Sequence, residues 1–129
     1  MEYKIRESNG VTIVDLNGRL SLGEAIAFGP GSGTSLRDVV PKLLKEGKRK
    51  ILLNLKDVNY IDSSGIGDII TAYSSTRNQG GELRLASPSP QVRDLFQITK
   101  LYTILDVSDD ETTALKGFQK AGQPSTSVA

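Results

Sequence analysis

The feature that most constrains the fold is an aliphatic run that passes almost directly into a helical pattern. Residues 50–55 are nearly all aliphatic on both faces of an extended chain, as expected for a strand in a parallel sheet covered by helices. A second apolar stretch covers residues 58–61, and the hexapeptide Asp62–Gly67 (DSSGIG) follows it at once. From Ile66 the apolar residues recur at helical spacing. This order predicts a buried strand that ends at the N-terminus of a helix.

The hexapeptide predicts a functional site at that junction. The first backbone N–H groups of a helix lack intrahelical partners, and the helix dipole attracts negative charge there. Asp or Ser at this place can be an ordinary N-cap, but one cap needs only one such residue. We expect Gly65 and Gly67 to leave the first turn bare, at a cost of up to about 1 kcal/mol each relative to Ala. The hexapeptide thus contains more polar residues and glycines than a cap requires. This favours a site at which a serine is phosphorylated and recognised.

The composition argues against catalysis by this chain alone. The sequence has no His and no Cys, which excludes a Ser-His-Asp triad, thiolate chemistry and zinc sites built on those residues. A Ser-Lys pair stays formally open, with Lys56 the nearest lysine to the hexapeptide. The 16 basic and 15 acidic residues give a net charge of +1, and Trp is absent, so we expect no nucleic-acid partner. We expect no metal and no cofactor in this chain.

The length and the hydropathy pattern predict one soluble cytoplasmic domain. A chain of 129 residues can bury one ordinary core. No apolar run is long enough to cross a bilayer, and no N-terminal segment resembles a signal peptide. The absence of Cys suits a reducing compartment. We expect no membrane association and a monomer.

The remaining segments alternate between strand and helix signals. Two strands are predicted at 2–7 and 10–17, with a turn at 8–10. A helix capped by Thr34 or Ser35 runs to about Gly47, and Pro41 either kinks it or marks a later start. Further predictions are a helix to about 78, a strand at 82–86, a short helix from 88–90, a strand at 102–107 and a closing helix from 109.

These elements predict an α/β sandwich. We expect a mixed, mostly parallel sheet of about five strands, with helices largely on one face and the N-terminal hairpin at one edge. The domain covers residues 1–118, and residues 119–129 form a flexible tail. Residues 25–28 could form a short helix before a glycine-rich loop at 29–33, which lacks the Lys of a Walker A motif.

With these segments in view, the chain resembles a STAS domain, and more narrowly the bacterial anti-sigma factor antagonists. The resemblance covers roughly residues 2–117 and is carried mainly by the aliphatic strand with the hexapeptide. It implies a module that binds an anti-sigma factor serine kinase when dephosphorylated and releases it when phosphorylated, which regulates sigma-dependent transcription. A serine phosphatase resets the switch, and ATP and Mg belong to the kinase.

The resemblance also implies roles for individual residues. Ser63 would be the phosphoacceptor, and Asp62 would orient it. The partner-binding surface would comprise Asp62, Ser64, Gly65, Ile66, Gly67, Ser21 and Leu22. The chain departs from the family at Ser21, where an acidic residue is common, and the following loop is longer and richer in Gly. The sigma factor, the kinase and the role of the loop at 29–33 stay open.

Two alternatives belong to other functional classes. A constitutive STAS subunit of a larger assembly, such as a lipid-transport or signalling scaffold complex, would use the same helix start without phosphate turnover. A complex that survives Ser63→Asp would point to that class. An enzyme in its own right would need hydrolysis that is abolished by Ser63→Ala.

Overall fold

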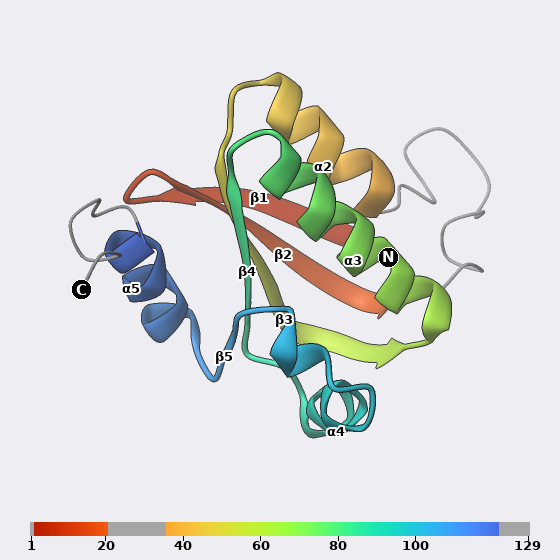
Figure 1. Ribbon diagram of the computed structural model, residues 1–129. Coiled ribbons are helices and arrows are strands. Elements are labelled where there is room, and N and C mark those ends of the chain that lie inside the picture. Colours follow the sequence, from red (N-terminus) through yellow and green to blue (C-terminus); the bar gives the residue numbers. More distant parts are fainter. Residues whose placement is uncertain (1, 21–35, 122–129) are drawn as a thin grey trace.

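The protein forms a five-stranded mixed sheet with helices packed against both faces (Figure 1). The computed structural model describes residues 2–20 and 36–121. The strand order is β1-β2-β3-β4-β5; β1 and β2 are antiparallel, and the later neighbours are parallel. This confirms the predicted mixed, mostly parallel sheet. The strands are β1 (Glu2–Ser8), β2 (Val11–Leu20), β3 (Lys50–Ile61), β4 (Glu82–Ala86) and β5 (Val107–Ser108).

The N-terminal hairpin lies at one edge of the sheet, as predicted. Its turn residues Asn9 and Gly10 have φ values of 52° and 81°, both in the left-handed region. Two such residues in series are typical of a type I′ hairpin turn, and Asn-Gly is the sequence that this turn favours. The turn therefore fixes the β1–β2 register, in which Ile5 lies opposite Val14.

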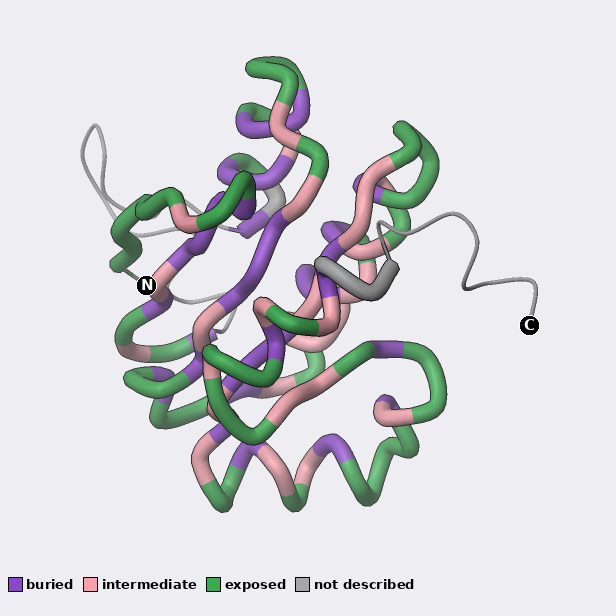
Figure 2. The backbone as a smooth tube through the Cα atoms, turned by 90° about the vertical axis from the view of Figure 1, so that its left-hand side faces the viewer, coloured by how far each residue is buried: buried purple, intermediate pink, exposed green. Residues whose placement is uncertain are grey.

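The helices cover the two faces of the sheet unequally. Helices α2, α3 and α4 contribute to the main core, together with strand residues such as Val14, Leu53 and Leu85. Helix α5 packs on the other face, where Phe118 meets Ile13 and Leu52 in a smaller cluster. Figure 2 shows the buried stretches concentrated in the central strands. The helices are α2 (Leu36–Lys45), α3 (Ser63–Asn78), α4 (Pro90–Ile98) and α5 (Glu111–Ala121).

Helix α2 contains Pro41 in its interior. The helix has already begun at Leu36, so the interpretation that Pro41 marks a later start is wrong. Its buried residues include Val39, Val40 and Leu43, which lie at helical spacing. The predicted caps at 34–35, the short helix at 25–28 and the glycine-rich loop at 29–33 lie outside the described residues.

The predicted strand at 102–107 is wrong. A short 3-10 helix, η1 (Leu101–Thr103), and a turn occupy most of it, and β5 comprises only Val107–Ser108. Leu101 and Leu105 are both buried, and the Leu105 N–H donates to the Leu101 carbonyl at 2.8 Å. Their spacing of four residues suits a turn of helix, whereas a strand alternates with period two. Further on, α5 includes residues 119–121 of the predicted tail, and 122–129 lie outside the described residues.

Strand β3 is longer than the predicted core strand and leads directly to the hexapeptide. It runs without a break from Lys50 to Ile61. Its register with β2 shifts twice, so that β3 carries an extra residue near Lys56 and again at Asn59. Such bulges bend a strand and redirect its side chains. They account for the irregular burial of the second half of β3, where Val58 and Ile61 are buried and the residues between them are exposed.

Candidate functional site

The hexapeptide forms the junction between β3 and α3. Ile61 is the last residue of β3, and Ser63 is the first residue of α3. Asp62 between them has an extended backbone, and its Oδ1 accepts a hydrogen bond from the Gly65 N–H at 3.0 Å. Its carbonyl accepts from the Ile66 N–H, also at 3.0 Å. Asp62 is therefore the N-cap of α3, and capping needs neither of the two serines that follow.

The two serines differ in exposure. Ser63 is exposed, and Ser64 beside it is half-buried. Within the described part of the chain, neither hydroxyl makes a hydrogen bond to another side chain or to the backbone. Ser63 thus presents a free hydroxyl at the N-terminus of a 16-residue helix, where unpaired N–H groups and the helix dipole favour a negative group.

The two glycines of the hexapeptide have different roles. A Cβ on Gly65 would lie 2.1 Å from the Leu20 carbonyl oxygen and 2.8 Å from its carbon, so Gly65 is required by close packing against β2. A Cβ on Gly67 would meet nothing within 4 Å. The expectation that both glycines leave the first turn bare is therefore correct for Gly67 only, because Gly65 is buried.

The start of α3 is tied to the end of β2. The Asp62 N–H donates to the Leu20 carbonyl at 3.3 Å, in addition to the packing of Gly65 on the same residue. Ser21 and Leu22, which the sequence predicts to bind the partner, lie outside the described residues. They follow Leu20 directly in the sequence.

The face of α3 that follows the hexapeptide packs inward as predicted. Ile69 is buried, and the half-buried side chains of Ile66, Ile70 and Tyr73 pack against the main core. Ile66 is thus shared between the core and the surface beside Ser63. This leaves Ser63, Ser64 and Gly67 as the members of the hexapeptide that a partner can meet without disturbing the fold.

Sequence reasoning missed one pair of residues near the junction. Arg19 and Tyr60 are paired across β2 and β3, and the Arg19 guanidinium carbon lies 4.4 Å from the centre of the Tyr60 ring. Tyr60 is 43% exposed and lies one residue before the end of β3. No local signal could reveal the pair, because it depends on the β2–β3 register and its two bulges.

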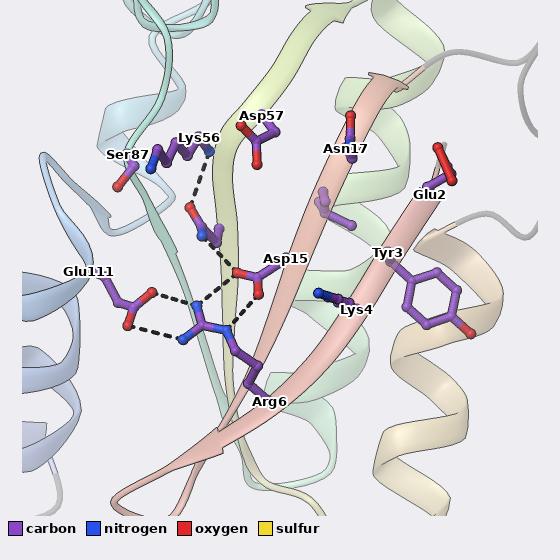
Figure 3. A pocket seen from close by; sticks show the side chains of 12 residues that line it. Glu2, Tyr3, Lys4, Arg6, Asp15, Asn17, Lys56, Asp57, Ser87 and Glu111 are labelled. Carbon is purple, nitrogen blue, oxygen red and sulfur yellow. Dashed lines mark hydrogen bonds and ion pairs between the residues drawn. The ribbon is translucent and has the colours of Figure 1, made fainter.

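A polar groove of about 590 Å³ lies on the sheet face that α5 partly covers (Figure 3). Arg6 joins β1 to Asp15 on β2 and to Glu111 on α5, with Nη2 2.8 Å from Asp15 Oδ1 and 2.6 Å from Glu111 Oε1. These bonds from Arg6, with one from Asn54, hold the pKa of Asp15 below its ordinary value. Lys56 also lines this groove, whose lining includes no residue of the hexapeptide. The structure therefore provides no support for a pair of Lys56 with Ser63.

The described residues provide neither a metal-binding cluster nor a membrane-spanning helix. Residues 2–20 and 36–121 bring together no group of three or more carboxylates that could hold a metal ion. Over the same ranges, no helix is long and apolar enough to cross a membrane.

The fold and the capped serine junction together define a STAS domain, and the chain belongs to the STAS domain family, whose family model matches residues 2–114. Its relatives within that family include bacterial anti-sigma factor antagonists. It is 29% identical over 120 residues to the anti-sigma F factor antagonist of Paenibacillus polymyxa, covering 89% of this chain and 92% of the relative. It is 36% identical over 77 residues to the anti-sigma-B factor antagonist of Bacillus subtilis, covering 60% and 70%.

Solved structures agree with the sequence relatives. The crystal structure of the Thermotoga maritima protein TM1081, a candidate anti-sigma factor antagonist, superposes with a TM-score of 0.76 at 28% identity. The match covers 89% of this chain and 92% of that protein. The resemblance found in the sequence is thereby confirmed for the family and for the fold.

Proposed function

We propose that this chain is an anti-sigma factor antagonist that is switched by phosphorylation of Ser63. The observation that carries the proposal is the exposed Ser63 hydroxyl at the first position of α3, capped by Asp62 so that no serine is needed for capping. The relatives that are named anti-sigma factor antagonists support the class of partner. The dephosphorylated chain binds an anti-sigma factor and thereby frees a sigma factor for transcription.

The chemical step belongs to the partner, which we propose to be a serine kinase that supplies ATP and Mg. The Ser63 Oγ attacks the γ-phosphorus of ATP, the bond to the bridging oxygen breaks, ADP leaves and the hydroxyl proton is lost. The product carries about −1.5 to −2 charges at neutral pH. A serine phosphatase hydrolyses the ester and restores the free hydroxyl. The chain itself has no catalytic residue and no cofactor in this proposal.

The geometry of the junction explains why such a phosphate would act on binding more than on folding. The start of α3 offers free N–H groups and a favourable dipole, so the folded monomer tolerates the charge. A partner surface that accepts a neutral hydroxyl would meet a bulky dianion instead. The adjacent Asp62 carboxylate would add to the negative charge that this partner surface meets. Ser64, Ile66 and Gly67 would frame the contact, Gly65 would set its shape through Leu20, and Ser21 and Leu22 would extend it.

The setting of this function is also proposed. We infer a cytoplasmic, monomeric domain that contacts neither nucleic acid nor membrane directly. The near-neutral charge of +1 supports the absence of a bulk attraction to nucleic acid.

The test is phosphorylation in lysate of the source bacterium. The purified chain is incubated with lysate and Mg-ATP, and peptides that contain the hexapeptide are examined by mass spectrometry. Wild type is compared with Ser63→Ala and with Ser64→Ala as the matched control. Phosphate on wild type and on Ser64→Ala, absent from Ser63→Ala, is the expected result. Absence of phosphate from wild type across several growth states would overturn the switch and favour a constitutive binding subunit.

A further inference from the structure

Within residues 2–20 and 36–121, the second half of β3 has a neighbouring strand on one side only. Strand β2 pairs with β3 as far as Ile61, whereas β4 pairs with it only over Lys50–Asn54. The Asn54 side chain closes the shorter ladder, because its Oδ1 accepts the Lys56 N–H at 3.1 Å. In Figure 1, β3 continues beyond the end of β4 toward the start of α3, with α4 on the side away from β2. An edge of the central strand is therefore open next to α4 in the described part of the chain.

Two hollows follow that open edge. The larger, of about 500 Å³, lies between residues 56–59 of β3 and residues 89–91 at the start of α4. The smaller, of about 270 Å³, lies between residues 59–61 and Gln91, Val92 and Leu95. Asn59 and Gln91 line both hollows, so we treat the two as one β3–α4 groove. The smaller hollow has no charged residue in its lining, and Tyr60, Ile61, Val92 and Leu95 give it an apolar floor.

We propose that the β3–α4 groove binds an extended segment of the same partner protein that contacts Ser63. The proposal rests on the proposed function and deepens it. An extended peptide gains affinity from main-chain hydrogen bonds to an exposed strand edge, and specificity from hollows that take its side chains. Here the edge is the second half of β3, and the apolar hollow selects an apolar side chain. The side-chain amides of Asn59 and Gln91 lie where they can bond to the backbone of that segment.

The position of the groove identifies the occupant as the switch partner. Ile61 lines the smaller hollow, and Asp62 and Ser63 follow it directly. At about 3.3 Å per residue of extended chain, the hollow ends within about 7 Å of the phosphoacceptor. A protein docked on Ser63 therefore reaches the groove without crossing another element. The contact surface then includes the groove as well as the hexapeptide.

The charge at the end of the groove adds a further requirement on the partner. Arg19 lies over the exposed Tyr60 ring, and Tyr60 lines the smaller hollow. A cation thus borders an otherwise uncharged hollow. A partner segment that carries a carboxylate next to its apolar side chain would complement this end of the groove.

The test compares two glutamate substitutions on α4. Gln91 lines both hollows, whereas Gln97 is exposed on the same helix and lines neither. The probe is the purified kinase that phosphorylates Ser63, titrated calorimetrically without ATP into the full dephosphorylated chain. Gln91→Glu should weaken binding tenfold or more, because its carboxylate repels the carboxylate expected on the partner segment, and Gln97→Glu should weaken it less than twofold. Backbone amides of residues 56–61 should exchange more slowly in the wild-type complex.

The outcomes separate this proposal from the one on which it rests. Equal affinities of the two variants together with unchanged exchange at 56–61 would overturn the groove proposal and leave the Ser63 switch intact. Absence of phosphate from Ser63 of wild type would overturn the switch, and the groove proposal with it. Circular dichroism of both variants checks that the fold is retained, as expected for exposed side chains.

Discussion

Gly65 lies so close to Leu20 that the smallest side chain would collide with the backbone of β2. A Cβ at this position would approach the Leu20 carbonyl oxygen to 2.1 Å, a contact that only movement of the backbone could relieve. The same carbonyl accepts the Asp62 N–H at 3.3 Å. The first turn of α3 is thus held against the end of β2 by packing and by a hydrogen bond. The position of Ser63 follows from both contacts.

Alanine at the two glycines of the hexapeptide should have opposite effects. Gly65→Ala should destabilise the protein by at least about 2 kcal/mol, because overpacking forces the backbone to shift. Gly67→Ala should be neutral or stabilise by up to about 1 kcal/mol, because its Cβ enters open space and alanine favours helix. Urea unfolding of the two variants beside wild type measures both values. Equal stabilities would contradict the contact with Leu20.

Removal of the cap should weaken the start of α3. Asp62→Ala deletes the acceptor of the Gly65 N–H and should cost about 0.5–2 kcal/mol, the usual range for a lost N-cap. Asp62→Asn keeps a side-chain oxygen at the same place and is the matched control, with a small effect. Chemical denaturation gives the stabilities, and faster exchange of the Gly65 amide in Asp62→Ala locates the loss. An Asn variant as unstable as the Ala variant would indicate that charge, rather than the bond, matters.

A negative charge at Ser63 should leave the fold intact. Ser63→Asp places a carboxylate in the favourable field of the helix N-terminus, so the free energy of unfolding should stay within about 1 kcal/mol of wild type. Asn78→Asp places the same charge at the exposed C-terminal residue of α3 and should be less stable than Ser63→Asp. Melting temperatures at low salt compare the two. A large loss of stability in Ser63→Asp alone, or in the phosphorylated chain, would argue against a switch that acts through binding.

The Arg6–Asp15 contact should make stability depend on pH in the acid range. The hydrogen bonds from Arg6 lower the pKa of Asp15 from its ordinary value of 3.8. The stability that Asp15 contributes is therefore full above about pH 5 and is lost as the pH falls below 4 through the lowered pKa. Asp15→Asn should flatten the stability profile between about pH 2 and pH 5. Urea unfolding across that range measures it.

Salt provides the control for the pH experiment. The side chain of Arg6 is 43% exposed, so screening should reduce its contribution. Added salt should then bring the profiles of wild type and Asp15→Asn closer together. A wild-type profile as flat as that of the variant at low salt would mean that the contact does not persist in solution.

The elements that the sequence predicts well are those with local signals at both ends. Helix α3 begins after the Asp62 cap and ends before Gly80. The φ of Gly80 is 78°, in the left-handed region that glycine adopts readily. The type I′ turn at Asn9-Gly10 is equally local. The prediction of a strand at 102–107 is wrong because a short apolar run does not distinguish a strand from a turn of helix. The burial of both Leu101 and Leu105, with the hydrogen bond between their backbones, identifies the turn of helix.

The candidate site likewise combines features that local sequence signals predict with features that they do not. Its chain order and its cap follow from the hexapeptide itself. The role of Gly65 depends on Leu20, and the Arg19–Tyr60 pair depends on the bulged register of β3. Both are contacts between segments that are distant in the sequence, so neither can be predicted from local signals. The β3–α4 groove likewise cannot be predicted from the sequence, because it lies where β4 no longer pairs with β3.

The division of labour within the hexapeptide bears on how copies of this protein diverge inside one cell. Asp62 and Gly65 secure the fold, whereas Ser64 and Gly67 face outward to a greater degree and contribute less to it. A duplicated gene can therefore change its outward residues, and with them its choice of partner, while the duplicate still folds. Parallel signalling routes built on this scaffold can be insulated from one another by very few substitutions, all within reach of a single serine.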